Sequence, residues 1–194
     1  DEILQLKTKL ADKYFCNFSV FQSVPDSWAI GQVFPVLPIQ RLNEEPVRDA
    51  TLEDITCDSD GRLDLFIGTN RSNTPTLKVH QLEQGEPYQL GIFLTGSYQE
   101  ILGDLHNLFG DTNTFHVSIQ EDGSLKYEQI IEGENVTDVL DYVQFKADEL
   151  SGRVSGFLVN YVETGNITQE EANEFLSLYK EGLKGYTYLL KSNS

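Results

Sequence analysis

Residues 115–143 read FHVSIQEDGSLKYEQIIEGENVTDVLDYV, and the spacing of the hydrophobic residues changes within this stretch. Residues 115–119 and 125–131 are rich in β-branched and aromatic side chains, which favour strands. Asp122-Gly123 between them is typical of a tight hairpin turn, where glycine takes the positive φ that the turn requires. After Gly133 the apolar residues recur at helical spacing. The stretch therefore predicts a hairpin followed by a helix.

Several more strands are expected before this hairpin. The runs that predict them cover residues 50–56, 63–67, 77–82 and 88–94. Asp60-Gly61 lies between two of these runs and gives a second hairpin signature with a positive-φ glycine. A strand buried on both faces is expected over 14–21, ended by a corner at Val24-Pro25-Asp26. Residues 33–37, which contain Pro35 and are followed by Pro38, predict an edge strand or an extended loop.

Three amphipathic helices are expected after the strands, and a short helix is expected over 2–13. The three later stripes are Val136, Val139, Leu140 and Val143; Val154, Phe157, Leu158 and Tyr161; and Ala172, Phe175, Leu176 and Tyr179. Thr168-Gln169-Glu170-Glu171 is a capping box that begins the last helix, and Gly182 and Gly185 mark its end.

Strands followed by helices indicate an α+β fold: an antiparallel β-sandwich or barrel, then a C-terminal three-helix segment. The expected division is 1–13 as the tail of a preceding helix or a linker, 14–133 as a β-sandwich domain, and 134–194 as a C-terminal helical segment.

Composition excludes several classes of function. The net charge of −17 over 194 residues would repel phosphate backbones, so nucleic acid is not an expected partner. No apolar run reaches the roughly 20 residues of a membrane span. Cys16 and Cys57 lack metal-type spacing and form no disulfide framework, which favours a reducing compartment. Since the chain has no methionine, we expect it to begin inside a longer gene product.

The densest cluster of reactive side chains is Ile55-Thr56-Cys57-Asp58-Ser59-Asp60-Gly61, where a thiol and two carboxylates share a strand end and its turn. Asp and Gly are common in hairpins without any function, and that interpretation stays open. A calcium loop does not fit, because its first and twelfth ligands would be Thr56 and Ile67.

Two further clusters contain glycines or aromatic residues. Glycines at 91, 96, 103 and 110 indicate a backbone that a ligand or another chain approaches, or a connection with no special role. His106 lies in this segment, and a lone histidine is more often structural than catalytic. Residues 23–35 contain Trp28 beside Asp26 and are interpreted as a packing corner.

Taken together, these stretches resemble one family. The matching motifs, in order, are NFSVFQS (17–23), PDSW (25–28), DITCDSDG (54–61), GSYQEILGDLHNLFGD (96–111) and GYTY (185–188). In order and spacing they look like the biosynthetic arginine decarboxylases of bacteria and plants. The resemblance covers nearly the whole chain but only about the C-terminal third of the family's length.

The resemblance implies a pyridoxal-phosphate-dependent lyase of the alanine-racemase-like class. In that class a TIM-type barrel carries the Schiff-base lysine, a β-sandwich follows it, and the active sites form at the dimer interface. The implied reaction converts L-arginine to agmatine and carbon dioxide for polyamine synthesis in the cytoplasm. The implied partners are the barrel domain of the same enzyme and a second subunit, as a homodimer or higher oligomer. Pyridoxal phosphate would be bound mainly by the barrel, and the family also allows Mg²⁺. This chain alone is expected to be inactive.

The resemblance also assigns roles to individual residues. Cys57-Asp58 matches a Cys-Asp pair of the related ornithine decarboxylases, so Cys57 is the candidate general acid that protonates Cα. Asp58 would pair with the substrate guanidinium, and Asp60, whose spacing departs from the ornithine-type pattern, would be a second contact. Tyr98 in Gly96-Ser97-Tyr98 matches a Gly-Ala-Tyr segment and would donate to the cofactor phosphate. His106 and Asn107 would lie at the interface near the site entrance. No metal ligand is assigned.

Two alternatives stay open at this point. The chain could be a non-catalytic homologue or an interaction module of the same fold, although such a module needs neither Cys57 nor Tyr98. It could also belong to a decarboxylase of another basic substrate, such as ornithine, lysine or carboxynorspermidine.

Overall fold

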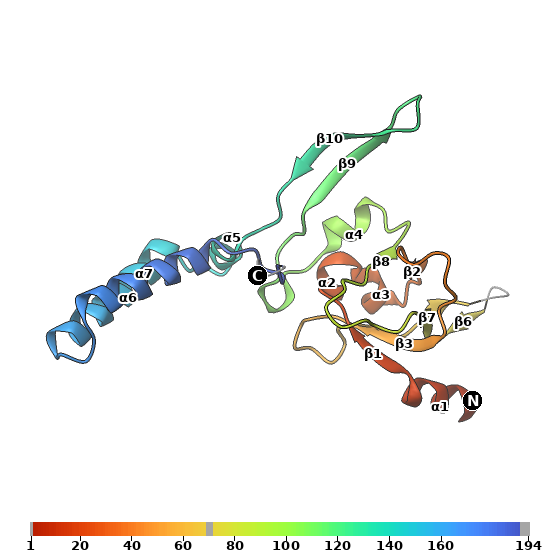
Figure 1. The fold of residues 1–194 in the computed structure, drawn as a ribbon, viewed down its shortest axis with the longest axis horizontal. Helices are drawn as coiled ribbons and strands as arrows, with labels where there is room; N and C mark the ends of the chain where they lie inside the picture. Colours follow the sequence, from red (N-terminus) through yellow and green to blue (C-terminus); the bar gives the residue numbers. More distant parts are fainter. Residues whose placement is uncertain (1, 69–71, 191–194) are drawn as a thin grey trace. The chain divides into compact units, whose positions relative to one another are not determined.

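The computed structural model describes residues 2–68 and 72–190, so residues 1 and 191–194 of the expected terminal segments lie outside the described residues. The chain divides into two compact units, Asp1–Asn107 and Leu108–Ser194. Figure 1 labels most of the helices and strands of the two units.

The first unit is built around strand β3 (Arg48–Glu53). It pairs in parallel with β1 (Asp12–Phe15) and antiparallel with β4 (Arg62–Leu63) and β7 (Leu77–Val79). Two smaller antiparallel sheets pair β2 (Val36–Pro38) with β8 (Leu90–Ile92), and β5 (Phe66–Ile67) with β6 (Asn73–Thr74).

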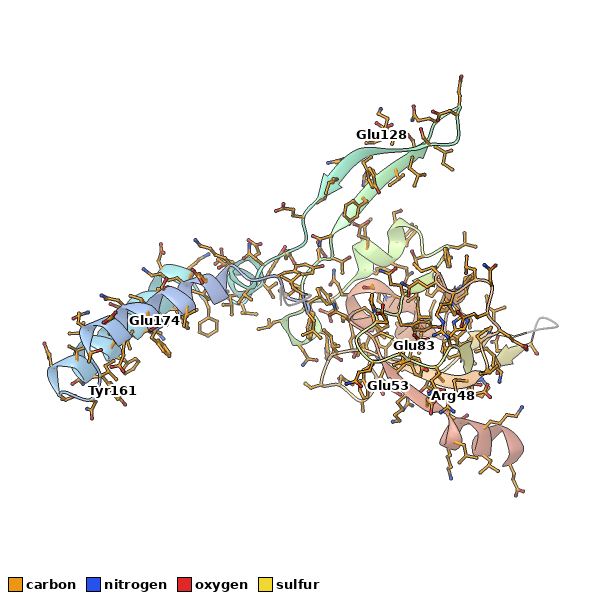
Figure 2. The ribbon with its side chains drawn as sticks, viewed as in Figure 1. Arg48, Glu53, Glu83, Glu128, Tyr161 and Glu174 are labelled. Carbon is orange, nitrogen blue, oxygen red and sulfur yellow. The ribbon has the colours of Figure 1, made fainter. Side chains whose placement is uncertain are left out.

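Short helices complete the first unit. They are α1 (Glu2–Leu10), α2 (Val20–Ser23), α3 (Pro25–Ile30) and α4 (Ser97–Leu102). A 3₁₀ turn, His106–Leu108, follows at the boundary of the unit. Charged residues mark both ends of β3: Arg48 binds Asp12 Oδ2 at 2.7 Å, and the Glu53 carboxylate lies 3.9 Å from Lys13 Nζ (Figure 2).

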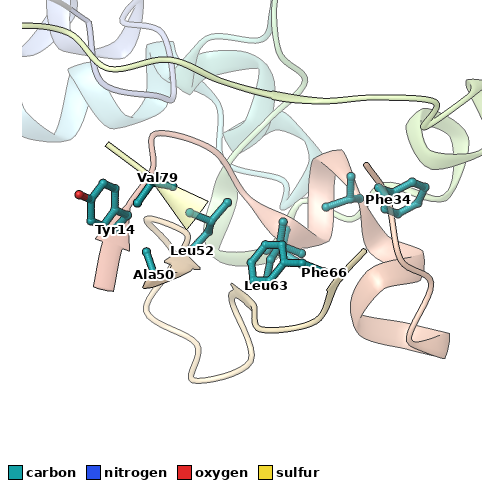
Figure 3. Packing of buried hydrophobic residues seen from close by; sticks show 9 residues of the cluster. Tyr14, Phe34, Ala50, Leu52, Leu63, Phe66 and Val79 are labelled. Atoms are coloured by element: carbon teal, nitrogen blue, oxygen red, sulfur yellow. The ribbon is translucent and has the colours of Figure 1, made fainter. Parts of the chain in front are cut away.

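The hydrophobic core of the first unit joins β3 to α2. Ala50 and Leu52 of β3 are buried against Val79 and Phe66, and Val20 brings α2 into the same cluster (Figure 3). Burying a valine, leucine or phenylalanine side chain contributes about 1.5–3 kcal/mol. The core therefore fixes α2 against the strand that leads into the Cys57 loop.

The second unit begins with a hairpin of β9 (Thr114–Ile119) and β10 (Leu125–Ile131), which pair antiparallel. Gly123 in its turn has a φ of 83°, as the sequence predicts. Three helices follow: α5 (Val136–Tyr142), α6 (Ala147–Glu163) and α7 (Gln169–Leu183). The Thr168 side chain accepts from Glu171 N–H, and the Glu171 carboxylate accepts from Thr168 N–H, so the predicted capping box is confirmed.

The α+β class and the three C-terminal helices are confirmed, whereas a sandwich or barrel is not evident. The strands in the described parts of the chain form one four-stranded sheet and three two-stranded sheets, without a closed barrel or a clear sandwich. The β1–β3 pair is parallel, which departs from the expected antiparallel arrangement. Several predicted strands shorten to two or three residues.

Two local predictions near the site were wrong. The strand expected over 14–21 ends at Phe15, and a helix begins at Val20 because Ser19 caps it by accepting from Gln22 N–H. The expected corner at Pro25 is instead the first turn of α3, where proline has no N–H to leave unpaired.

Gly61 also differs from its prediction, because its φ is not positive. A Cβ on Gly61 would overlap Asp54 Oδ1 and lie 2.6 Å from Thr56 Oγ1. Glycine is needed there for space and not for its φ.

The described residues include no helix long and apolar enough to cross a membrane.

Candidate functional site

A buried carboxylate fixes the loop that contains Cys57. Asp54 is 3% exposed, and its Oδ2 accepts the backbone N–H of Val20 at 2.9 Å. Its Oδ1 accepts the Thr56 N–H at 2.9 Å and the Thr56 hydroxyl at 2.7 Å. The backbone adds Ile55 N–H to Phe18 O, and Asp54 N–H to Gly61 O. These hydrogen bonds therefore connect the beginning of the loop to the start of α2 and to Gly61 at the end of the loop.

This arrangement presents Cys57 and Asp58 at the surface on a defined backbone. Cys57 is an exposed free cysteine, and the Asp58 side chain is 35% exposed. The Asp58 N–H points at Thr56 Oγ1, 3.4 Å away, which links Asp58 to the buried Asp54 network. An accessible thiol and a carboxylate thus stand next to each other, outside the core.

The contact that Asp60 makes with Asp58 comes from its backbone and not from its side chain. Its N–H donates to Asp58 Oδ1 at 2.8 Å, an Asx-type turn that directs the Asp58 carboxylate. The Asp60 residue is itself exposed. Its predicted contact with a guanidinium stays a prediction.

Tyr98 lies in the first turn of α4 and is 74% exposed. Its neighbour Gln99 is 4% exposed and anchors the helix to α3. The Gln99 amide donates to Asp26 Oδ2 at 2.7 Å, and its Oε1 accepts the Asp26 N–H at 3.1 Å. Because Gln99 points inward, the phenol of Tyr98 is left outside, where its hydroxyl can donate a hydrogen bond.

His106 links the second motif to the first. Its Nε2 lies 3.1 Å from Asp58 Oδ2, and its ring stacks on Phe21 with the centroids 4.2 Å apart. Asn107 is exposed and has a φ of 57°, a left-handed conformation that asparagine tolerates better than most residues. The fold thus joins Asp58 to His106, while no contact is observed that joins Asn107 to them.

A separate groove of about 740 Å³ lies beside β1 and β8. Its lining includes Tyr14, Cys16, Phe18, Tyr88 and Leu90, and it contains none of the predicted site residues. Burial raises the pKa of the Cys16 thiol to about 11, so this thiol stays protonated near neutral pH. Of the two cysteines, the exposed Cys57 is therefore the better candidate for proton transfer.

The described residues contain no group of three His, Cys, Asp or Glu side chains that could hold a metal ion.

Comparisons with known proteins show what the chain is similar to. Residues 136–189 match the family model described as the arginine decarboxylase C-terminal helical extension. The biosynthetic arginine decarboxylase of Bacteroides thetaiotaomicron is 58% identical over 97% of this chain. The chain is homologous to the C-terminal region of biosynthetic arginine decarboxylases.

Other arginine decarboxylases agree with this. The biosynthetic arginine decarboxylase of Rhodopirellula baltica is 51% identical over 97% of this chain and 28% of its own length. The crystal structure of the Campylobacter jejuni biosynthetic arginine decarboxylase superposes with a TM-score of 0.79 at 35% identity, covering 92% of this chain and 29% of that one. The chain spans 30% of the length of the Bacteroides thetaiotaomicron relative.

Sequence reasoning missed two residues that shape the site. Asp54 was part of a quoted motif but received no role, and Gln99 lay in a segment where no helix was expected. A signal existed for Asp54, because a carboxylate two residues before Thr56 is suited to an Asx turn. Gln99 gave no local signal, since its partner Asp26 is 73 residues away.

Proposed function

We propose that this chain is the C-terminal part of a cytoplasmic, pyridoxal-phosphate-dependent arginine decarboxylase. The reaction converts L-arginine to agmatine and carbon dioxide for polyamine synthesis. The observation that carries the proposal is the loop from Asp54 to Gly61, on which a buried carboxylate holds an exposed thiol and carboxylate in a fixed conformation. The homology over nearly the whole chain supports it.

Cys57 is proposed as the general acid. When bound, the cofactor supplies an electron sink for the pair left at Cα as carbon dioxide departs. The Cys57 thiol then gives its proton to Cα, a new C–H bond replaces the broken C–C bond, and the thiolate regains its proton from solvent. Its exposure in this chain leaves Sγ accessible to a pocket completed by another segment.

Asp58 and Asp60 are proposed to receive the guanidinium. A carboxylate pairs with guanidinium through two parallel N–H···O bonds, which fixes geometry as well as charge. Asp58 already accepts the Asp60 N–H on Oδ1, and an ionised carboxylate has lone pairs left for a bidentate partner. The Tyr98 hydroxyl would bind the cofactor phosphate, as its exposed phenol on α4 permits.

The partners proposed are the barrel domain of the same enzyme and a second subunit, as a homodimer or higher oligomer. Residues 14–133 would act as the sandwich portion, completed by the remaining polypeptide, and 134–194 as the helical segment. The family resemblance also allows Mg²⁺. His106 and Asn107 would stand near the entrance of the shared pocket.

The test is to coexpress this chain with the barrel portion of a close relative and to assay agmatine formation from arginine. Each part alone should be inactive, and the pair should release agmatine. The matched control is the same pair carrying Cys57→Ala, which removes only the thiol. Binding of the two parts without activity would contradict the proposal and favour an interaction module. Activity on ornithine or lysine in place of arginine would overturn the substrate assignment alone.

A further inference from the structure

The predicted site residues come from two segments far apart in the sequence, and a side-chain contact joins them. His106 Nε2 lies 3.1 Å from Asp58 Oδ2, with the two side chains 32% and 35% exposed. A carboxylate can only accept hydrogen bonds, so this contact is favourable when Nε2 carries the hydrogen. His106 thus contacts the carboxylate that the proposed function assigns to the guanidinium.

The imidazole ring of His106 also packs against a buried aromatic side chain. Phe21 is 2% exposed and stacks against the ring with an interplanar angle of 37°. Trp28 packs its edge on Phe21 with centroids 5.2 Å apart. The backbone is fixed too, because Asp104 N–H donates to Phe21 O at 3.0 Å. The ring therefore has a defined position before any ligand arrives.

Asp58 consequently has a partner at each carboxylate oxygen. Oδ1 accepts the Asp60 N–H at 2.8 Å, and Oδ2 lies 3.1 Å from His106 Nε2. Contacts at two different oxygens restrict the rotation of the carboxylate plane. These contacts also set the direction in which the remaining lone pairs of the carboxylate point. Bidentate recognition of a planar guanidinium depends on that direction.

We propose that His106 is a positioning residue that orients Asp58 for the substrate guanidinium. The inference deepens the proposed function and rests on it. Its prediction is specific: the Nε2–H donor controls arginine binding, and the stacked ring serves only to place that donor.

The experiment uses the complete decarboxylase and two variants that separate the donor from the ring. His106→Phe keeps the stacking on Phe21 and removes the donor. His106→Gln keeps a neutral N–H donor at similar reach and removes the ring. We expect His106→Phe to raise KM for arginine about tenfold, the effect of losing one hydrogen bond to a charged group, with kcat within about twofold. His106→Gln should stay within about threefold of the wild type in both.

A second ligand separates positioning from general damage. Agmatine retains the guanidinium and lacks the carboxylate, so its inhibition constant should rise in parallel with the arginine KM in His106→Phe. The cofactor dissociation constant should not change in either variant. If His106→Phe does not fold, the comparison of His106→Gln with His106→Leu isolates the donor, because both lack the stacked ring.

The variant Asp58→Asn distinguishes failure of the positioning role of His106 from failure of the proposed role of Asp58. Adding His106→Phe to Asp58→Asn should have almost no further effect on KM, since the partner of the donor is already altered. If Asp58→Asn raises KM and His106→Phe does not, positioning is wrong and the proposed function stands. If Asp58→Asn leaves the arginine KM unchanged, the proposed role of Asp58 itself fails. A lower KM in His106→Phe would mean that His106 competes with the substrate, which also overturns the inference.

Discussion

The buried carboxylate of Asp54 accepts a hydrogen bond from the backbone N–H of Val20, a residue 34 positions earlier in the chain, at 2.9 Å. Val20 is the first residue of α2, whose N–H groups have no partner within the helix. The Asp54 side chain therefore accepts a hydrogen bond from the start of α2. Through its hydrogen bonds with Thr56 it also holds the loop that contains Cys57.

Removing this carboxylate should destabilise the first unit. Asp54→Ala would leave the N–H groups of Val20 and Thr56 without their acceptor, so we expect the free energy of unfolding to fall by about 3 kcal/mol. Urea denaturation measures it. The control is Asp64→Ala, which removes an exposed carboxylate paired with Arg62 and should cost less than about 1 kcal/mol. Equal losses in both variants would refute the role of Asp54.

Gly61 should be intolerant of a methyl group. A Cβ there overlaps Asp54 Oδ1, so Gly61→Ala should lower the unfolding free energy by about 2 kcal/mol. The control is Gly152→Ala, for which the unfolding free energy should change in the opposite direction. Gly152 lies within α6 with open space around its Cβ position, so this substitution should stabilise the protein by about 0.5–1 kcal/mol. Hydrogen exchange resolved by residue assigns each change to its own unit. A neutral Gly61→Ala would mean that the Asp54 network can move aside.

The two cysteines should differ in reactivity. Burial raises the pKa of Cys16 to about 11, so its thiolate fraction is very small near neutral pH, and Cys57 is exposed. Iodoacetamide at about pH 8 should modify Cys57 first, as peptide mass spectrometry can establish. The Cys16 rate should keep rising with pH until about pH 11. Cys57→Ser should abolish the fast phase, and a fast phase that survives would contradict the assignment.

Cys57→Ala in the complete enzyme should lower kcat by about a hundredfold, because a positioned general acid contributes at least that much. The cofactor dissociation constant should not change, since the proposal gives the thiol no contact with the phosphate. Steady-state agmatine assays and absorbance titration with pyridoxal phosphate measure the two quantities. Cys16→Ala is the matched control and should leave kcat unchanged. Weakened cofactor binding in Cys57→Ala would instead indicate a structural role.

Tyr98→Phe should give the reverse pattern. Losing one hydrogen bond to a charged phosphate should raise the cofactor dissociation constant about tenfold. At saturating cofactor, kcat should be close to that of the wild type. Tyr127→Phe is a suitable control, because Tyr127 is also exposed, at 60%, but lies on the β10 strand of the other unit. The same dissociation constant in Tyr98→Phe and the wild type would remove Tyr98 from the phosphate site.

Local chemistry explains which elements the sequence could predict. The β9–β10 hairpin and the three C-terminal helices depend on residue spacing, on the Gly123 turn and on the capping box at Thr168, and each acts within a few residues. The strand expected over 14–21 failed for the opposite reason. Its residues suit a strand, but Ser19 and the distant Asp54 provide hydrogen bonds that start a helix at Val20.

By itself, the sequence determined the α+β class, the helical C-terminus and the motifs of the arginine decarboxylase family, because periodicity, turn chemistry and motif order are properties of neighbouring residues. Only the tertiary structure decided that Asp54 ties the Cys57 loop to α2, that Gln99 turns Tyr98 outward, and that His106 lies against Asp58. These contacts join residues separated by 34 to 73 positions. Such pairings depend on how the whole core packs, and no local pattern encodes them.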